Sequence, residues 1–91
     1  MKKVIVYSQE GCTYCAELKN LLQSEGVEYR VKDIDENKED WDVISEHSGV
    51  QYVPTVLMVD TSDESGRVLA PDRDFDEVTE CVQHIMTELY G

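Results

Sequence analysis

Basic residues are scarce in this chain. Eight lysines and arginines stand against 20 aspartates and glutamates, which gives a formal net charge of −12. Such a charge repels the phosphates of nucleic acids and the headgroups of anionic membranes. We therefore expect no nucleic-acid partner and no membrane partner. A surface of this kind also keeps copies of a protein apart, so we expect a monomer.

Long hydrophobic runs are also lacking. No apolar stretch approaches the ~20 residues that a membrane-spanning helix needs. The first apolar run, residues 4–7, is too short for the apolar region of a signal peptide, and no small-residue cleavage site follows it. These absences predict a cytoplasmic protein.

Cysteine is too sparse for a disulfide framework. The chain has three cysteines, which cannot all pair, and a reducing compartment would keep structural bridges open. Cys12 and Cys15 have the C-x-x-C spacing, which in such a compartment indicates redox chemistry or a metal site. Cys81 falls among the apolar positions of a predicted helix, so we expect it to pack in the core.

The remaining pattern is that of one folded domain over residues 1–91. Of these residues 41% are hydrophobic, and there is no repeat, low-complexity segment or linker. Continuous apolar runs predict strands over residues 3–7 and 55–59, and alternation of apolar and polar residues predicts a strand over residues 27–34. A turn at residues 62–66 predicts a short return strand over residues 67–69. Hydrophobic periodicity predicts helices over residues 13–25, 37–48 and 74–89. The last helix is expected to start at a capping-box-like pair, Asp74 and Glu77.

The order β-α-β-α-β-β-α predicts an α/β fold. The first crossover should give a parallel strand pair, and the final hairpin should add antiparallel strands to the same sheet. With helices on both faces, the result is a three-layer α/β/α domain around a four-stranded mixed sheet.

Cys12 and Cys15 lie where the first strand gives way to the first helix. A thiolate attacks disulfides, so the site must stabilise negative charge on sulfur. The free N–H groups and the positive dipole end of a helix N-terminus do this, and they lower a thiol pKa from about 8.5 to about 3.5–7.5. The amides of Tyr14 and Cys15 are the expected donors to the Cys12 sulfur. Cys15, more buried, is expected to keep its proton until it attacks a mixed disulfide on Cys12.

Zinc is the competing reading of this motif. A structural zinc site needs four nitrogen or sulfur ligands. The only other nitrogen or sulfur candidates are Cys81, His47 and His84. The ligand supply therefore favours redox chemistry over metal.

The proline of Val53-Pro54-Thr55 allows two interpretations. Proline lacks an N–H and is tolerated at the start of a strand, so Pro54 can mark a strand boundary. It can also carry a cis peptide bond, which is uncommon and which the residues alone do not support.

Together these features resemble the glutaredoxin family. Residues 4–8 followed by Cys12-Thr13-Tyr14-Cys15 match the family's strand, C-x-[YF]-C motif and helix. Residues 21–26 and 27–35 match its first helix and second strand, and residues 53–56 match its cis-proline loop. The resemblance is good over residues 3–60 and covers the rest in helix placement only.

The resemblance implies a thioredoxin-like fold and a thiol–disulfide oxidoreductase. By that resemblance Cys12 is the nucleophile and Cys15 the resolving thiol of a dithiol mechanism. Pro54 is cis and leaves the Val53 backbone free to pair with the backbone of a bound thiol substrate. Two further residues are implied to contact substrate or glutathione: Thr13 and Tyr14.

The resemblance also implies partners. Protein disulfides or glutathione mixed disulfides are the implied substrates, with ribonucleotide reductase as a family-level candidate. Glutathione is the implied co-substrate, with no tightly bound cofactor and no metal. The glutathione-binding segment is degenerate, because Ala70-Pro71-Asp72 stands where the family has Gly-Gly and an acidic pair. Gln9 replaces the family's basic residue ahead of the motif. The reductant is therefore either glutathione or a thioredoxin reductase.

Two other functions stay open at this point. One is an iron–sulfur or metal carrier in which Cys12 supplies the ligand, although the presence of Cys15 and Tyr14 argues against it. The other is a redox-responsive adaptor that binds a partner without turnover.

Overall fold

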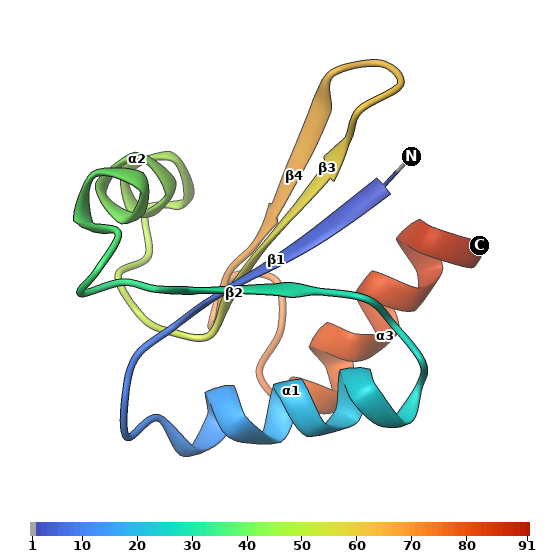
Figure 1. Ribbon diagram of the computed structural model, residues 1–91, viewed down its shortest axis with the longest axis horizontal. Coiled ribbons are helices and arrows are strands. Elements are labelled where there is room, and N and C mark those ends of the chain that lie inside the picture. Colours follow the sequence, from blue (N-terminus) through green and yellow to red (C-terminus); the bar gives the residue numbers. More distant parts are fainter. Residues whose placement is uncertain (1) are drawn as a thin grey trace.

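The computed structural model describes residues 2–91. It contains seven elements: β1 (Lys2–Ser8), α1 (Thr13–Ser24), β2 (Arg30–Asp33), α2 (Lys38–Ser48), β3 (Thr55–Asp60), β4 (Ser65–Leu69) and α3 (Val78–Tyr90). Figure 1 shows them in the predicted order, and the α/β class is confirmed. Within residues 2–91 every helix is too short or too polar to traverse a bilayer.

The four strands form one mixed sheet in the order β2-β1-β3-β4. β1 is parallel to β2 and antiparallel to β3, and β3 and β4 form an antiparallel hairpin. The predicted four-stranded sheet is therefore confirmed. Because β3 runs against β1 and β4, the end of β1, the start of β3 and the end of β4 meet at one edge of the sheet.

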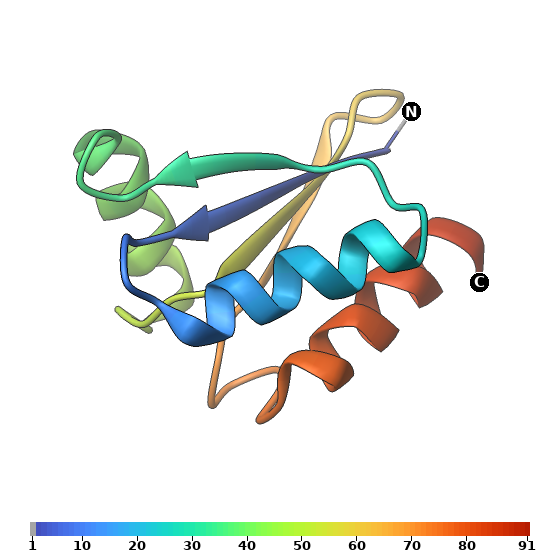
Figure 2. The same ribbon diagram turned by 60° about the horizontal axis from the view of Figure 1, so that its bottom comes forward.

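The core lies between the sheet and two helices. α1 and α3 lie side by side on one face of the sheet (Figure 2). Side chains alternate along a strand, so Val4 and Val6 of β1 point to that face, where they join one buried cluster with Leu18, Leu22 and Ile85. Burial of each of these side chains stabilises the folded state by about 1.5–3 kcal/mol.

The third layer is thinner. Tyr7, which points away from Val6, contacts Trp41 of α2 with ring centroids 5.8 Å apart. Figure 1 shows α2 on the side of the sheet away from α1 and α3. The contact between Tyr7 and Trp41 places α2 on the second face of the sheet and completes the three-layer arrangement.

Gly26 follows the end of α1, directly after the predicted helix over residues 13–25. It has φ of 71°, a left-handed conformation that favours glycine. The amides of Gly26 and Val27 donate to the carbonyls of Gln23 and Leu22 at 3.1 Å and 3.0 Å. This is a Schellman motif, and it turns Val27 into the core beside Leu22.

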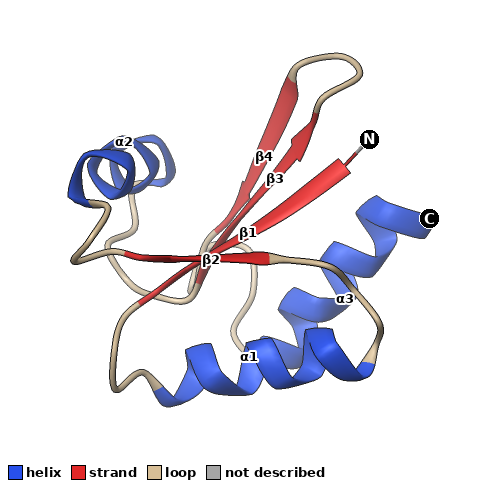
Figure 3. Cartoon of the chain, viewed as in Figure 1, coloured by secondary structure: helices blue, strands red, loops and turns tan. Residues whose placement is uncertain are grey.

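Figure 3 shows the strands and helices along the chain. Two predicted starts are wrong by three residues or more, and the other boundaries differ from the prediction by two residues at most. The second strand covers Arg30–Asp33 and not 27–34, because only these four residues are paired in register with β1. Val27 is buried instead, and its amide bonds to α1. The last helix begins at Val78 and not at 74, with a capping box made by Glu77 and Glu80. The carboxylate of Asp74 is used instead inside the preceding loop.

Candidate active site

A tight turn carries the chain from the end of β1 into α1. Gly11 adopts φ of 83°, and the amide of Cys12 donates to the carbonyl of Gln9 at 3.2 Å. Cys12 is the N-cap of α1 with an extended backbone (φ −83°, ψ 108°). The turn therefore places the first cysteine at the helix tip, as predicted.

The two motif cysteines form a disulfide, with their Cα atoms 5.2 Å apart. Cys12 is partly exposed, whereas Cys15 is 1% exposed beneath the first turn of α1. A partner can therefore reach the sulfur of Cys12 more readily than that of Cys15.

The Cys12 sulfur accepts a hydrogen bond from the helix. The amide of Cys15 donates to Cys12 Sγ at 3.2 Å. The second expected donor, the Tyr14 amide, is not among the bonds recorded for that sulfur in residues 2–91. The Cys15 amide and the positive end of the helix dipole therefore face the sulfur, which favours the thiolate of Cys12 once the disulfide is reduced.

The loop before β3 lies against the same sulfur. The Val53–Pro54 peptide bond is cis. The Val53 carbonyl oxygen lies 4.0 Å from Cys12 Sγ, although 41 residues separate the two in the chain. Pro54 is buried, and Thr55 Oγ1 donates to the Tyr52 carbonyl at 2.8 Å, which fixes the exit of the loop.

An open groove runs beside Cys12 on the β2 side. It has a volume of about 690 Å³ and is lined by residues 8–13, Ala16, Lys19, Val31 and Asp33. Its charged groups are Glu10, Asp33 and one lysine, so the groove leans acidic like the chain as a whole. Gln9 Nε2 also lies 3.5 Å from a carboxylate oxygen of Asp35.

The two remaining predicted site residues are exposed. Thr13 lines the groove, and Tyr14 projects from the first turn of α1 with 65% of its surface exposed. Tyr52, two residues before Pro54, is similarly exposed at 66%. Sequence analysis did not single out Tyr52, and its position two residues before the proline was the only available signal.

The other candidate ligands and nucleophiles do not join this site. Cys81 is a free, buried cysteine, and burial raises the pKa of its thiol to about 12. Among residues 2–91 no group of three or more histidine, cysteine or acidic side chains is placed to hold a metal ion.

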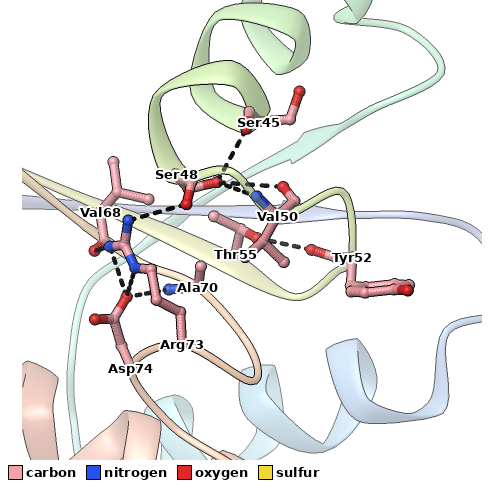
Figure 4. Close-up of polar contacts among 9 residues, drawn as sticks. All are labelled: Ser45, Ser48, Val50, Tyr52, Thr55, Val68, Ala70, Arg73 and Asp74. Carbon is pink, nitrogen blue, oxygen red and sulfur yellow. Dashed lines mark hydrogen bonds and ion pairs between the residues drawn. The ribbon is translucent and has the colours of Figure 1, made fainter.

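One feature of this edge was missed by sequence analysis. Arg73 and Asp74, in the loop after β4, form a polar network with the end of α2 (Figure 4). The available signal was an arginine between Asp72 and Asp74 in a chain with few basic residues.

Comparison with known families supports the resemblance seen in the sequence. The model of the family described as Glutaredoxin matches residues 4–61, a segment that includes both motif cysteines and Pro54. N-acetyl-S-hydroxy-L-cysteine reductase of Bacillus subtilis (strain 168) is 36% identical over 53 residues, 58% of this chain and 57% of that protein. Glutaredoxin 3 of Escherichia coli (strain K12) is 34% identical over 58 residues, 64% of this chain and 70% of that protein.

Solved structures show the same fold. The glutaredoxin of Archaeoglobus fulgidus superposes with a TM-score of 0.65 and 21% identity, covering 100% of this chain and 89% of that one. A buckwheat glutaredoxin–glutathione complex gives a TM-score of 0.54 and 24% identity, covering 60% of this chain and 53% of that one. At these identities the likeness concerns the thioredoxin-like fold. The chain spans little more than half the length of the Bacillus relative that it matches.

Proposed function

The chain belongs to the glutaredoxin family, and from that premise we propose that it is a thiol–disulfide oxidoreductase working through Cys12 and Cys15. The observation that carries the proposal is the disulfide between these residues at the tip of α1, with the Cys15 amide directed at the Cys12 sulfur. A helix N-terminus stabilises a thiolate, and the neighbouring thiol can resolve the mixed disulfide that this thiolate forms with a substrate.

The proposed cycle starts from the dithiol form. The Cys12 thiolate attacks one sulfur of a substrate disulfide and displaces the other as a thiolate, which takes a proton. Cys15 then loses its proton and attacks Cys12 Sγ, which releases the substrate as a thiol and forms the Cys12–Cys15 disulfide. Two glutathione thiols, or a thioredoxin reductase, then return two electrons and two protons to the disulfide.

The cis-proline loop is proposed to hold the substrate. A free backbone segment beside the attacked sulfur can pair with an extended substrate backbone. The proximity of the Val53 carbonyl to Cys12 Sγ supports this role for Val53 and Pro54. Exposed Thr13 and Tyr14 are the proposed side-chain contacts with substrate.

Protein disulfides and glutathione mixed disulfides are the proposed substrates, with glutathione as co-substrate and ribonucleotide reductase among the candidate proteins. Glutathione or a thioredoxin reductase is the proposed reductant. The buckwheat protein is described in complex with glutathione, which supports the first choice. The segment Ala70-Pro71-Asp72 and the acidic groove weaken an anion site, which supports the second. We propose a cytoplasmic monomer.

A sulfenate is a second candidate substrate. The Bacillus relative is named a reductase of a cysteine derivative whose sulfur carries a hydroxyl. The same two thiols can serve this reaction: Cys12 attacks the S–OH sulfur, hydroxide leaves and is protonated to water, and Cys15 resolves the mixed disulfide. One balanced dithiol cycle therefore covers both substrates.

Cysteine variants test the proposal. Cys12→Ser should lower disulfide-reductase turnover by ~100-fold or more, because the attacking thiolate is gone. Cys15→Ser should accumulate a mixed disulfide between Cys12 and a protein substrate, which mass spectrometry detects. Cys81→Ala is the matched control and should keep wild-type turnover. Retention of turnover by Cys12→Ser would falsify the assignment.

The reductant is tested with the wild-type protein. Turnover is compared with glutathione and its reductase, and with thioredoxin reductase, using a protein disulfide, a glutathione mixed disulfide and a cysteine sulfenate. At least one combination of reductant and substrate should sustain turnover. A colourless, metal-free product after anaerobic incubation with iron and sulfide would remove the carrier alternative.

A further inference from the structure

Arg73 connects two loops that meet at the cysteine edge of the sheet. It lies in the loop between β4 and α3, and its guanidinium reaches three acceptors (Figure 4). Nη2 donates to the Val68 carbonyl at 2.6 Å, Nη1 to the Ser48 carbonyl at 3.2 Å, and Nε to an Asp74 carboxylate oxygen at 2.8 Å. Ser48 is the last residue of α2, so Arg73 supplies a cation and a donor to a carbonyl that the helix leaves free.

Asp74 holds the Arg73 side chain in place. The same Asp74 oxygen accepts the Ala70 amide at 2.8 Å, and the Asp74 amide donates back to the Ala70 carbonyl at 2.9 Å. Burial raises the pKa of the Asp74 carboxyl, but the hydrogen bonds from Arg73 and Ala70 and the positive charges of Arg73 and Arg67 together lower it. The carboxylate therefore remains charged at neutral pH and keeps the guanidinium oriented.

The other end of this contact leads to the cis-proline loop. The Ser48 hydroxyl donates to the Val50 carbonyl at 3.2 Å and accepts the Val50 amide at 3.1 Å. Ser48 thus fixes the start of residues 49–54, while the bond from Thr55 to Tyr52 fixes their end. Between these two points lies Val53, whose carbonyl is beside Cys12 Sγ.

We propose that Arg73 is a positioning residue that sets how tightly the cis-proline loop binds substrate, acting through Ser48 on the backbone at Val53. The effect on substrate binding rests on the proposed function. Arg73 is bound to internal acceptors and does not contact either motif cysteine. Its loss should therefore loosen the substrate-binding backbone without changing the chemistry at sulfur.

Substitution of Arg73 tests this. In Arg73→Met the KM for a peptide disulfide should rise about tenfold, the size of effect expected when charge-assisted hydrogen bonds are lost. The value of kcat and the pH dependence of Cys12 alkylation should stay as in the wild type. The KM of Arg73→Lys should lie between those of the wild type and Arg73→Met, because an ammonium cannot reach three divergent acceptors at once.

Arg67→Met is the matched control. It removes the same charge and a similar volume from an exposed arginine of β4 that pairs with Glu88 of α3. Its KM should stay near the wild-type value. Equal KM values for the two methionine variants, or a loss of kcat at unchanged KM, would overturn the inference.

Amide hydrogen exchange separates this inference from the proposed function. The Val50 amide should exchange faster in Arg73→Met, and in Arg73→Lys if the methionine variant does not fold, but not in Arg67→Met. Unchanged exchange at residues 49–54 contradicts the positioning role whether or not the protein turns over. Absence of turnover in the wild type would instead contradict the proposed function.

Discussion

The three cysteines are one chemical group in three surroundings. Cys12 is partly exposed at a helix tip, Cys15 is 1% exposed one turn along, and Cys81 is buried on the core-facing side of α3. Access and helix amides favour attack by Cys12, while burial denies Cys81 both charge and contact with a substrate. The local surroundings therefore assign one attacking thiol among three.

Cys81 should make the fold less stable as the pH becomes alkaline. Burial, with a contribution from the charge of Asp74, raises the pKa of its thiol from 9.0 to about 12. The folded state then holds this proton across a range where the unfolded chain has lost it, so the free energy of unfolding should fall as pH rises above about 9. Urea unfolding of the reduced protein at pH 8 to 11 measures the slope.

Cys81→Ala should be less sensitive to pH over the same range. It keeps the contribution of Tyr7, whose pKa burial also raises. If the variant and the wild type lose stability in parallel, Cys81 is not the group responsible.

At the scale of elements, local signals predicted where helices end better than where the last one starts. Gly26 and Gly49 end α1 and α2 because a left-handed residue is needed there and glycine is the residue that supplies it readily. Asp74 is by residue type a better N-cap than Glu77. Its carboxylate instead binds Arg73 and the Ala70 amide, and this contact within a folded loop has no periodic signature in the sequence.

The actual start of α3 can be tested. Glu80 accepts the amides of Glu77 and Asp76 at 3.1 Å and 3.3 Å. Glu80→Ala should lower the free energy of unfolding by about 1 kcal/mol, the usual cost of losing a cap. Chemical denaturation measures this, with Gln83→Ala at an exposed position of the same helix as the control. A loss no larger than that of the control would mean that the capping box contributes nothing.

The whole molecule was predictable in outline because hydrophobic periodicity reports which faces are buried. The apolar run of β1 and the apolar stripe of α3 predict that both elements are buried, and Val6 and Ile85 lie in one core. The motif spacing likewise predicted that Cys12 and Cys15 would meet. What the pattern could not give is the contact of Arg73 with Ser48, because both partners are polar and 25 residues apart.

Net charge is the whole-molecule property that should govern encounter with substrates. A charge of −12, with Glu10 and Asp33 lining the groove at Cys12, attracts cations and repels anions over about a Debye length. For a peptide disulfide flanked by lysines, kcat/KM should fall about tenfold from about 10 mM to about 200 mM salt. For a glutamate-flanked peptide or a glutathione mixed disulfide it should rise.

A neutral disulfide of similar size provides the reference in this measurement. Its kcat/KM should change little with salt, which separates charge effects from effects of salt on the fold. The same salt dependence of kcat/KM for basic, acidic and neutral substrates would show that the net charge of the protein does not govern their encounter with it.

The ends of the described chain lie together, away from the cysteines. Lys2 at the start of β1 donates to the Glu88 carbonyl near the end of α3, and Figure 1 shows both termini on the same side of the molecule. Because β1 runs from that side to the helix tip, a fusion partner, an affinity tag or a solid support attached at either end would stand clear of the reacting sulfur. A short linker between the ends would also allow new termini to be opened in the hairpin turn at residues 61–64, giving a circular permutant with the same sheet.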